Sequence, residues 1–425
     1  MIQKLRGIYF GWYIIIVSMI ITMLTVGLRL GIGPFVLPMM EDLSLTRTFI
    51  SMIISVSMIM YGVGMPLAGY LCGKFSTKFV LLLGLVIIEL SVLGTVLTNN
   101  VWIFFFMYGV LLSFGLAFTS PVAVTPLISR WFVRQRGKAL FSLSTGSMAG
   151  IAIFNPLATF MIEAIGWRST LSIFAFIFII IIVPAAVLIF KEDVPEGADL
   201  NEDSSSAKSS TDEITPKLTL RDAIRTKAYW QIVAGLFACG FSMNLLGSHA
   251  VPMLIDHHFE PSTASFGVGM IGLVAIFSTL ILASIADRFS KRKLLFIIYF
   301  IRGLGFLGLV FSQNTWQLYL VAALGGLVWS GSIAISSAIL GELFGVKLLG
   351  VLYGWAYLGH QIGGAISSFL GGWGYEVFGT HVFSFGLASF TLIIAGIISY
   401  LIPEKTNLQN IKEYKLIGSG TTSSS

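Results

Sequence analysis

Charged side chains are scarce in this sequence. Only 11% of its 425 residues are Asp, Glu, Lys or Arg, whereas soluble domains carry roughly 25%. So little charge cannot cover the water-facing surface of a chain of this length, which argues against a soluble globular protein. The hydrophobic content of 56% and the mean hydropathy of +0.89 indicate that most of the surface faces lipid.

Cysteines are few, and the common catalytic motifs are absent. The two cysteines, Cys72 and Cys239, both lie in apolar runs, which argues against a disulfide scaffold and a cysteine-based metal site. There is no phosphate-binding Walker loop, no HExxH, no pair of catalytic carboxylates and no glycine-rich dinucleotide fingerprint. We therefore expect no enzymatic activity, no cofactor and no metal, and ATP-driven transport loses support.

Apolar stretches are what the sequence has in abundance. A bilayer-spanning helix needs about 20 mostly apolar residues, and twelve stretches qualify, six on each side of a polar segment. They are 9–39, 48–72, 79–98, 101–128, 138–162, 168–190, 229–254, 264–286, 293–312, 315–340, 348–372 and 381–403. The predicted fold is an all-α membrane protein made of two six-helix bundles.

The polar segment and the tail complete the predicted organisation. An N-terminal bundle, 1–190, is followed by an acidic, serine-rich segment, 191–227, which is typical of a flexible linker. The end of this linker, KLTLRDAIRTKAYW, is expected to form a short amphipathic helix. The C-terminal bundle covers 228–403, and 404–425 is a low-complexity tail.

Basic residues predict the orientation in the membrane. If the N-terminus is cytoplasmic, most lysines and arginines lie in inner loops, and the outer loops contain only Arg47 and Arg168. This positive-inside bias places both termini in the cytoplasm. The net charge of +6 therefore indicates topology and not binding to nucleic acid. We expect an integral plasma-membrane protein, in bacteria an inner-membrane protein, and a monomer.

The two halves of the chain repeat each other. At an offset of 214 residues, VLPMM at 36–40 aligns with AVPML at 250–254, KFSTK at 74–78 with RFSKR at 288–292, and NNVW at 99–102 with QNTW at 313–316. Short motifs also recur by chance in membrane proteins, but these matches include proline, tryptophan and basic loop residues. Two parallel halves place the solute site near the midplane between them.

Two loop motifs resemble a known family. GYLCGKFSTK at 69–78 and its repeat SIADRFSKRK at 284–293 are similar to the conserved loop of the major facilitator superfamily. The resemblance implies a role in conformational change for Gly69, Lys74, Lys78, Asp287, Arg288 and Arg292. The first copy departs from the family pattern, because it has Gly73 where the family usually has Asp.

Longer segments resemble one branch of this superfamily. FGWYIIIVSMI at 10–20, SRWFVRQRGKALFSLSTGSMAG at 129–150 and GHQIGGAISSFLGGWGYE at 359–376 are similar to bacterial relatives of the monocarboxylate porters. The resemblance implies that the first helix of each half lines the solute cavity and that every third helix is peripheral. Thr279 lies near the position where eukaryotic carriers of the branch have an Arg.

Among the lysines, arginines, aspartates and glutamates, three fall well inside predicted spans, where each costs roughly 2.5 to 3.5 kcal/mol. Arg29 is a candidate to bind a carboxylate through two parallel hydrogen bonds; alternatively it snorkels or binds helix carbonyls. Arg302, in a peripheral helix, contacts either solute or helix carbonyls. Glu89 is a candidate proton carrier, although its helix is also peripheral.

Further candidates are neutral polar residues. His249 in NLLGSHAVP titrates in the range needed to relay a proton, or is a hydrogen-bonded structural histidine. A polar stripe at helical spacing in 348–372 lines either the cavity or a helix–helix contact. The stripe contains Tyr353, Tyr357, His360 and Gln361, and Trp329 is a further candidate from 315–340.

These observations predict a secondary transporter. The basic excess among intramembrane charges favours a small organic anion, plausibly a monocarboxylate, carried in symport with a proton as co-substrate. The alternative is proton-driven export of an apolar or cationic compound, which usually needs an acid in the cavity. A membrane-embedded enzyme or a receptor needs a catalytic cluster or a large soluble module, and neither is visible.

Overall fold

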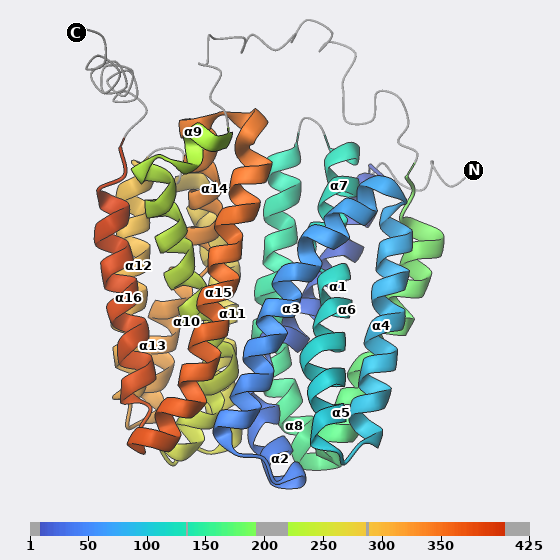
Figure 1. The fold of residues 1–425 in the computed structure, drawn as a ribbon, viewed down its shortest axis with the longest axis vertical. Coiled ribbons are helices and arrows are strands. Elements are labelled where there is room, and N and C mark those ends of the chain that lie inside the picture. The colour runs from blue at the N-terminus through green and yellow to red at the C-terminus, as the bar shows by residue number, and fades with distance from the viewer. Residues whose placement is uncertain (1–8, 133–134, 193–219, 286–288, 404–425) are drawn as a thin grey trace, which may run out of the picture.

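The computed structural model describes residues 9–132, 135–192, 220–285 and 289–403, and every regular element in these ranges is a helix (Figure 1). The first half contains α1 (Gly11–Leu30), α2 (Gly33–Leu43), α3 (Arg47–Lys74), α4 (Thr77–Leu97), α5 (Val101–Phe104), the π-helix η1 (Phe105–Leu112), α6 (Ser113–Phe118), α7 (Pro121–Trp131), α8 (Arg136–Pro184) and the π-helix η2 (Ala185–Ile189). The second half contains α9 (Leu220–Ile224), α10 (Lys227–Asp256), α11 (Pro261–Ile285), α12 (Lys291–Val310), α13 (Thr315–Leu327), α14 (Gly331–Phe344), α15 (Val346–Phe378) and α16 (Val382–Tyr400).

These helices confirm the predicted all-α membrane fold. Within the described ranges, ten helical stretches are long and apolar enough to cross a membrane. One of them, 138–189, contains two of the predicted spans, which meet at Gly166, whose φ of 77° only glycine adopts readily. The predicted span 348–372 lies within α15. Of the segment 217–230 predicted to form one amphipathic helix, Leu220–Ile224 form the short helix α9 and the residues from Lys227 belong to α10. Residues 193–219 of the linker and the tail from 404 lie outside the described residues.

Three predicted spans are interrupted in the structure. The first divides into α1 and α2, and Pro34 at the start of α2 needs no hydrogen-bond acceptor for its nitrogen. The fourth is divided among α5, η1, α6 and α7, the last of which begins at Pro121. The tenth divides into α13 and α14 at Val328–Ser330, where an arginine binds backbone carbonyls as described below.

The predicted repeat is visible in where the helices begin. α3 and α11 begin at Arg47 and Pro261, and α4 and α12 begin at Thr77 and Lys291. α5 and α13 begin at Val101 and Thr315, so in each of the three pairs the first residues of the two helices are 214 residues apart. The residues just before α3 and α4, Thr46 and Ser76, have hydroxyl side chains that accept a hydrogen bond from a backbone N–H in the first turn. These bonds fix the start of each helix.

The two halves lie side by side in Figure 1 and touch through a few helix pairs. α3 packs against α15, α8 against α11, and α2 against α10. We call the end of the molecule where α1 begins and α16 ends the proximal end, and the opposite end, where α2 lies, the distal end (Figure 1). The candidate site around Arg29, described next, lies where helices of the two halves meet.

Candidate substrate site between the two halves

Arg29 connects the two halves of the protein. It lies in the last turn of α1, and its Nη2 donates to Oδ1 of Asn244 on α10 at 3.1 Å and to Oε1 of Gln361 on α15 at 3.0 Å. The same nitrogen lies 3.1 Å from Sδ of Met58 on α3. The guanidinium is therefore held at a junction of four helices, two from each half.

No carboxylate neutralises this guanidinium among the residues that the structure describes. Its hydrogen-bond acceptors are neutral, and the guanidinium carbon lies 4.2 Å from the centre of the Tyr61 ring, a cation–π contact. The Nε atom is buried and has no partner in the described part of the chain. A partly buried cation with an unused donor is well suited to an anionic ligand.

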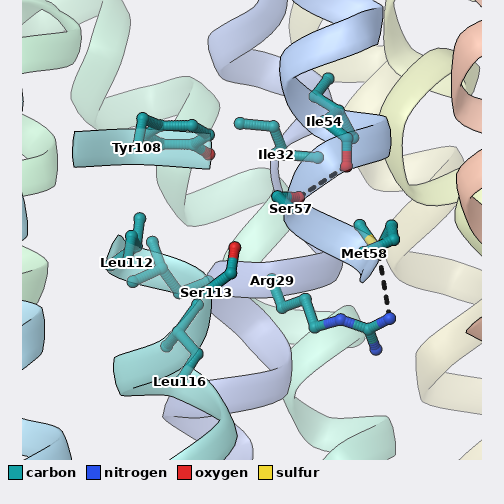
Figure 2. A pocket seen from close by; sticks show the side chains of 10 residues that line it. Arg29, Ile32, Ile54, Ser57, Met58, Tyr108, Leu112, Ser113 and Leu116 are labelled. Carbon is teal, nitrogen blue, oxygen red and sulfur yellow. Dashed lines mark hydrogen bonds between the residues drawn. The ribbon is translucent and has the colours of Figure 1, made fainter. Parts of the chain in front are cut away.

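A recess lined by residues of the first half lies beside Arg29 (Figure 2). It contains about 320 Å³ of atom-free space including its open side, and its lining combines apolar side chains with the polar groups of Arg29, Ser57, Tyr108 and Ser113. The guanidinium of Arg29 points away from the Leu112 side of the recess and toward Met58 (Figure 2). The residues that line it are Leu28, Arg29, Ile32, Ile54, Ser57, Met58, Tyr108, Leu112, Ser113 and Leu116.

The polar stripe of α15 follows the predicted spacing and reaches Arg29 at one end. Gln361 is buried and accepts the hydrogen bond from Arg29. The ring of His360 stacks on that of Tyr357 at 4.8 Å, and the rings of Tyr357 and Tyr353 are 5.8 Å apart. Both ring nitrogens of His360 are buried without a partner among the described residues. Such a nitrogen has unused capacity for solute or water.

Arg302 occupies a different environment. It is only 1% exposed, and its Nη2 donates to the carbonyl of Val328 at 2.9 Å and also to that of Trp329. Nη1 lies 3.3 Å from Sγ of Cys239, on α10. These carbonyls lie between α13 and α14, where they have lost their helical donors. Of the two predicted roles for Arg302, its contacts favour the carbonyl-binding one. Trp329 is buried at this interruption, over the Arg302 guanidinium.

The two candidates for proton transfer lie apart in the fold. His249 on α10 is 3% exposed, and its Nε2 lies 2.8 Å from the carbonyl oxygen of Ser368 and 3.5 Å from Oγ of Ser51. It therefore faces α15 and α3 at once. Glu89 lies on α4, and its Oε1 is buried without a partner among the described residues.

The predicted conformational loops lie at the proximal end. Gly69 and Lys74 are on the last turns of α3, and Lys78 is in the first turn of α4. In the second copy Arg292 lies on α12, with its guanidinium 5.8 Å from the Tyr400 ring centre. Asp287 and Arg288 of that copy lie outside the described residues.

Sequence reasoning missed three residues that contact Arg29. Asn244, Met58 and Tyr61 sit in apolar stretches, and a neutral side chain there gives no electrostatic signal. Asn244 carries the best available signal, because an amide inside a span needs a hydrogen-bond partner. Its Nδ2 donates to the carbonyl of Gly240 at 2.8 Å, which leaves Oδ1 directed at Arg29.

Comparison with known proteins gives relatives that are membrane transporters. The chain is 26% identical over 378 residues to YcxA of Bacillus subtilis, an uncharacterized MFS-type transporter, which covers 85% of this chain and 87% of YcxA. It is 27% identical over 188 residues to mouse monocarboxylate transporter 6, covering 44% of this chain and 40% of the relative.

A solved structure has the same fold. This is a bacterial homolog of the human lysosomal transporter Spinster in an inward-facing and occupied conformation, with a TM-score of 0.71, 14% identity, and coverage of 92% of this chain and 96% of that one. The family model of the Major Facilitator Superfamily matches residues 15–286 and 232–423. With this family match and these relatives, the chain is a transporter that belongs to the Major Facilitator Superfamily.

Proposed function

We propose that this transporter takes up a small organic anion of the monocarboxylate class together with a proton. The observation that carries the proposal is the guanidinium of Arg29, which lies between the two halves with neutral partners and no carboxylate among the described residues. A transported carboxylate would supply the missing negative charge. The monocarboxylate transporters among the relatives support this class of solute.

The surroundings of Arg29 suggest how such a solute would be held. Its carboxylate would bind the guanidinium by two parallel hydrogen bonds, on the side of Arg29 that faces α10 and α15. Gln361 and His360 would provide hydrogen bonds from α15. Because these groups come from both halves, binding would draw the two halves together.

Transport would follow from rocking of 1–190 against 228–403 around this site, with both termini in the cytoplasm. Arg302 and Trp329 would support the wall formed by α13 and α14, and the loops around Lys74 and Arg292 would control the proximal end. His249 and Glu89 are the candidates inside the membrane to carry the coupled proton, and His249 is better placed because it faces both halves.

Uptake by purified protein in proteoliposomes tests the proposal. Lactate, pyruvate and a panel of dicarboxylates would be offered with and without an inward proton gradient. We expect saturable uptake of at least one carboxylate, accelerated by the gradient and abolished in Arg29→Met. If no carboxylate accumulates under a proton gradient although the protein is folded, the proposal is wrong.

A further inference from the structure

An ionic cluster ties the two halves together at the distal end. Arg47, the first residue of α3, forms two hydrogen bonds with Asp256, the last residue of α10: Nη1 to Oδ2 at 2.5 Å and Nη2 to Oδ1 at 2.8 Å. Nε2 of His381, between α15 and α16, lies 2.8 Å from the same Oδ2. The Arg47 guanidinium carbon also lies 4.1 Å from the centre of the Tyr375 ring.

A second contact lies beside this cluster. The backbone N–H of Thr48, on α3, donates to Oε1 of Glu376, on α15, at 2.9 Å, and the Thr48 hydroxyl donates to Oε2 at 2.5 Å. Arg47 and Thr48 belong to the first half, and the residues they bind belong to the second. Opening a passage between the halves at the distal end therefore requires these bonds to break.

His381 has a free site for a proton. The residue is 1% exposed, and because its Nε2–H donates to Asp256, the neutral ring carries no hydrogen on Nδ1. Nδ1 is buried without a partner among the described residues. A proton added there would be buried with no acceptor and would place a second cation next to Arg47, with one carboxylate between them.

We propose that the cluster of Arg47, Asp256 and His381 is the distal gate of the transporter, and that protons taken up from the distal side by His381 and the neighbouring His257 open it. This inference rests on the proposed proton-coupled function, since it gives the coupling proton a place to act. Opening would expose Nδ1–H of His381 to water and separate the two cations. Protons arriving from the distal side, outside the cell in our orientation, would thus favour entry of the solute.

The electrostatic surroundings support this direction. Burial lowers the pKa of His381, against the opposite effect of Asp256, and burial also lowers the pKa of His257, which follows α10. Besides the members of the cluster and His257, the ionisable groups that face it are His249 and Tyr375, with His258 beside His257 and Glu376 held by Thr48.

The sign of the pH effect follows from these shifts. A histidine whose pKa is lowered in the closed gate regains its ordinary value of about 6.5 once it is exposed. The open gate therefore binds more protons, and its population rises as the pH falls through about 6.5. If a histidine stays neutral in the closed gate, lowering the pH from 7.5 to 5.5 raises the ratio of open to closed gates by up to about tenfold through that residue.

Distance measurements between spin labels test the gate without any solute. Labels at Leu97→Cys on the distal end of α4 and Ser262→Cys in the first turn of α11 report the separation of the halves, and both side chains are exposed. Native Cys72 and Cys239 are buried. In the labelled protein with no further substitution, we expect a longer distance between the labels to be well populated at pH 5.5 and to be a minor population at pH 7.5.

Variants of the histidines decide the assignment. In the double variant His257→Gln with His381→Gln, the distance distribution should no longer respond to pH, whereas His258→Asn, a control at a residue with positive φ where asparagine is tolerated, should respond fully. Asp256→Asn should populate the longer distance at both pH values, which tests the gate even if the double variant does not fold.

Three results would contradict the proposed gate. A wild-type distance that does not change with pH, a double variant that still responds, or an Asp256→Asn protein that stays closed would each overturn the gate. Failure of the proposed function looks different, because the gate would still respond to pH in a protein that transports no carboxylate.

Discussion

Replacing Arg29 separates charge from geometry at the candidate site. Arg29→Lys keeps a cation but loses the planar fork that binds a carboxylate twice, and Arg29→Met removes the cation while keeping most of the side-chain volume. In the structure one Nη of Arg29 serves Asn244 and Gln361, while Nε is unused. A bound carboxylate would therefore engage donors that the protein itself does not fully occupy.

The expected magnitude follows from the bonds lost. A hydrogen bond to a charged group contributes roughly 1.5 to 3 kcal/mol, so losing one of two in Arg29→Lys should raise KM about 10- to 150-fold. Arg29→Met loses both bonds and the charge attraction, which places uptake below detection. Arg29→Met also leaves Asn244 Oδ1 and Gln361 Oε1 without this donor, which lowers stability. The same substitution removes a cation that has no carboxylate partner among the described residues, which raises stability, so the two effects oppose each other.

Initial rates of carboxylate uptake into proteoliposomes, measured over a range of concentrations, provide the test. Thermal unfolding of each variant shows whether the protein is intact. A KM for Arg29→Lys equal to that of the wild type, or undiminished uptake by a folded Arg29→Met protein, would refute the assignment of Arg29 as the carboxylate ligand.

Three further predictions concern packing and stability. A Cβ on Gly372 would lie 2.1 Å from Ser51 Oγ and 2.4 Å from the carbonyl oxygen of Arg47, so Gly372→Val should hold the distal end open and reduce the rate of uptake more than tenfold. Gly354→Val is the control, because it lies on the same helix and a Cβ there has no atom within 4 Å; it should change neither the distal end nor uptake. Equal uptake by the two variants would contradict the close contact at Gly372. Arg302→Met should lower the free energy of unfolding by about 2 to 4 kcal/mol, because carbonyls of Val328 and Trp329 lose their donor, with KM unchanged; a rise in KM as large as that of Arg29→Met would make Arg302 a solute ligand. Asp42→Asn should change stability by less than about 1 kcal/mol in chemical denaturation, since its 2.9 Å ion pair with Arg168 is solvent-exposed, and a larger loss would contradict that reasoning.

The fold could be predicted from the sequence because lipid imposes a simple rule. Every backbone group in the bilayer must be satisfied, so apolar stretches of sufficient length become helices. The interruptions were harder to predict. Pro34 and Pro121 mark two of them, but the one between α13 and α14 contains no proline and depends on Arg302, which lies on α12.

The candidate site could be predicted only in part, for a related reason. Arg29 stood out because a charge in a span is costly, and the polar stripe of α15 stood out by its spacing. Asn244 and Tyr61 gave no comparable signal. The distal cluster was missed because Arg47 and Asp256 are ordinary charged residues at helix ends, and their pairing across 209 residues is set by how the two halves pack.

The central claim is that Arg29 holds an organic anion between the two halves, and equilibrium binding of radiolabelled carboxylates to the purified transporter tests it most directly. Wild-type protein should bind at least one carboxylate saturably, while folded Arg29→Met protein should bind none. Equal binding by the two proteins, or no binding of any carboxylate by the wild type, would contradict the account.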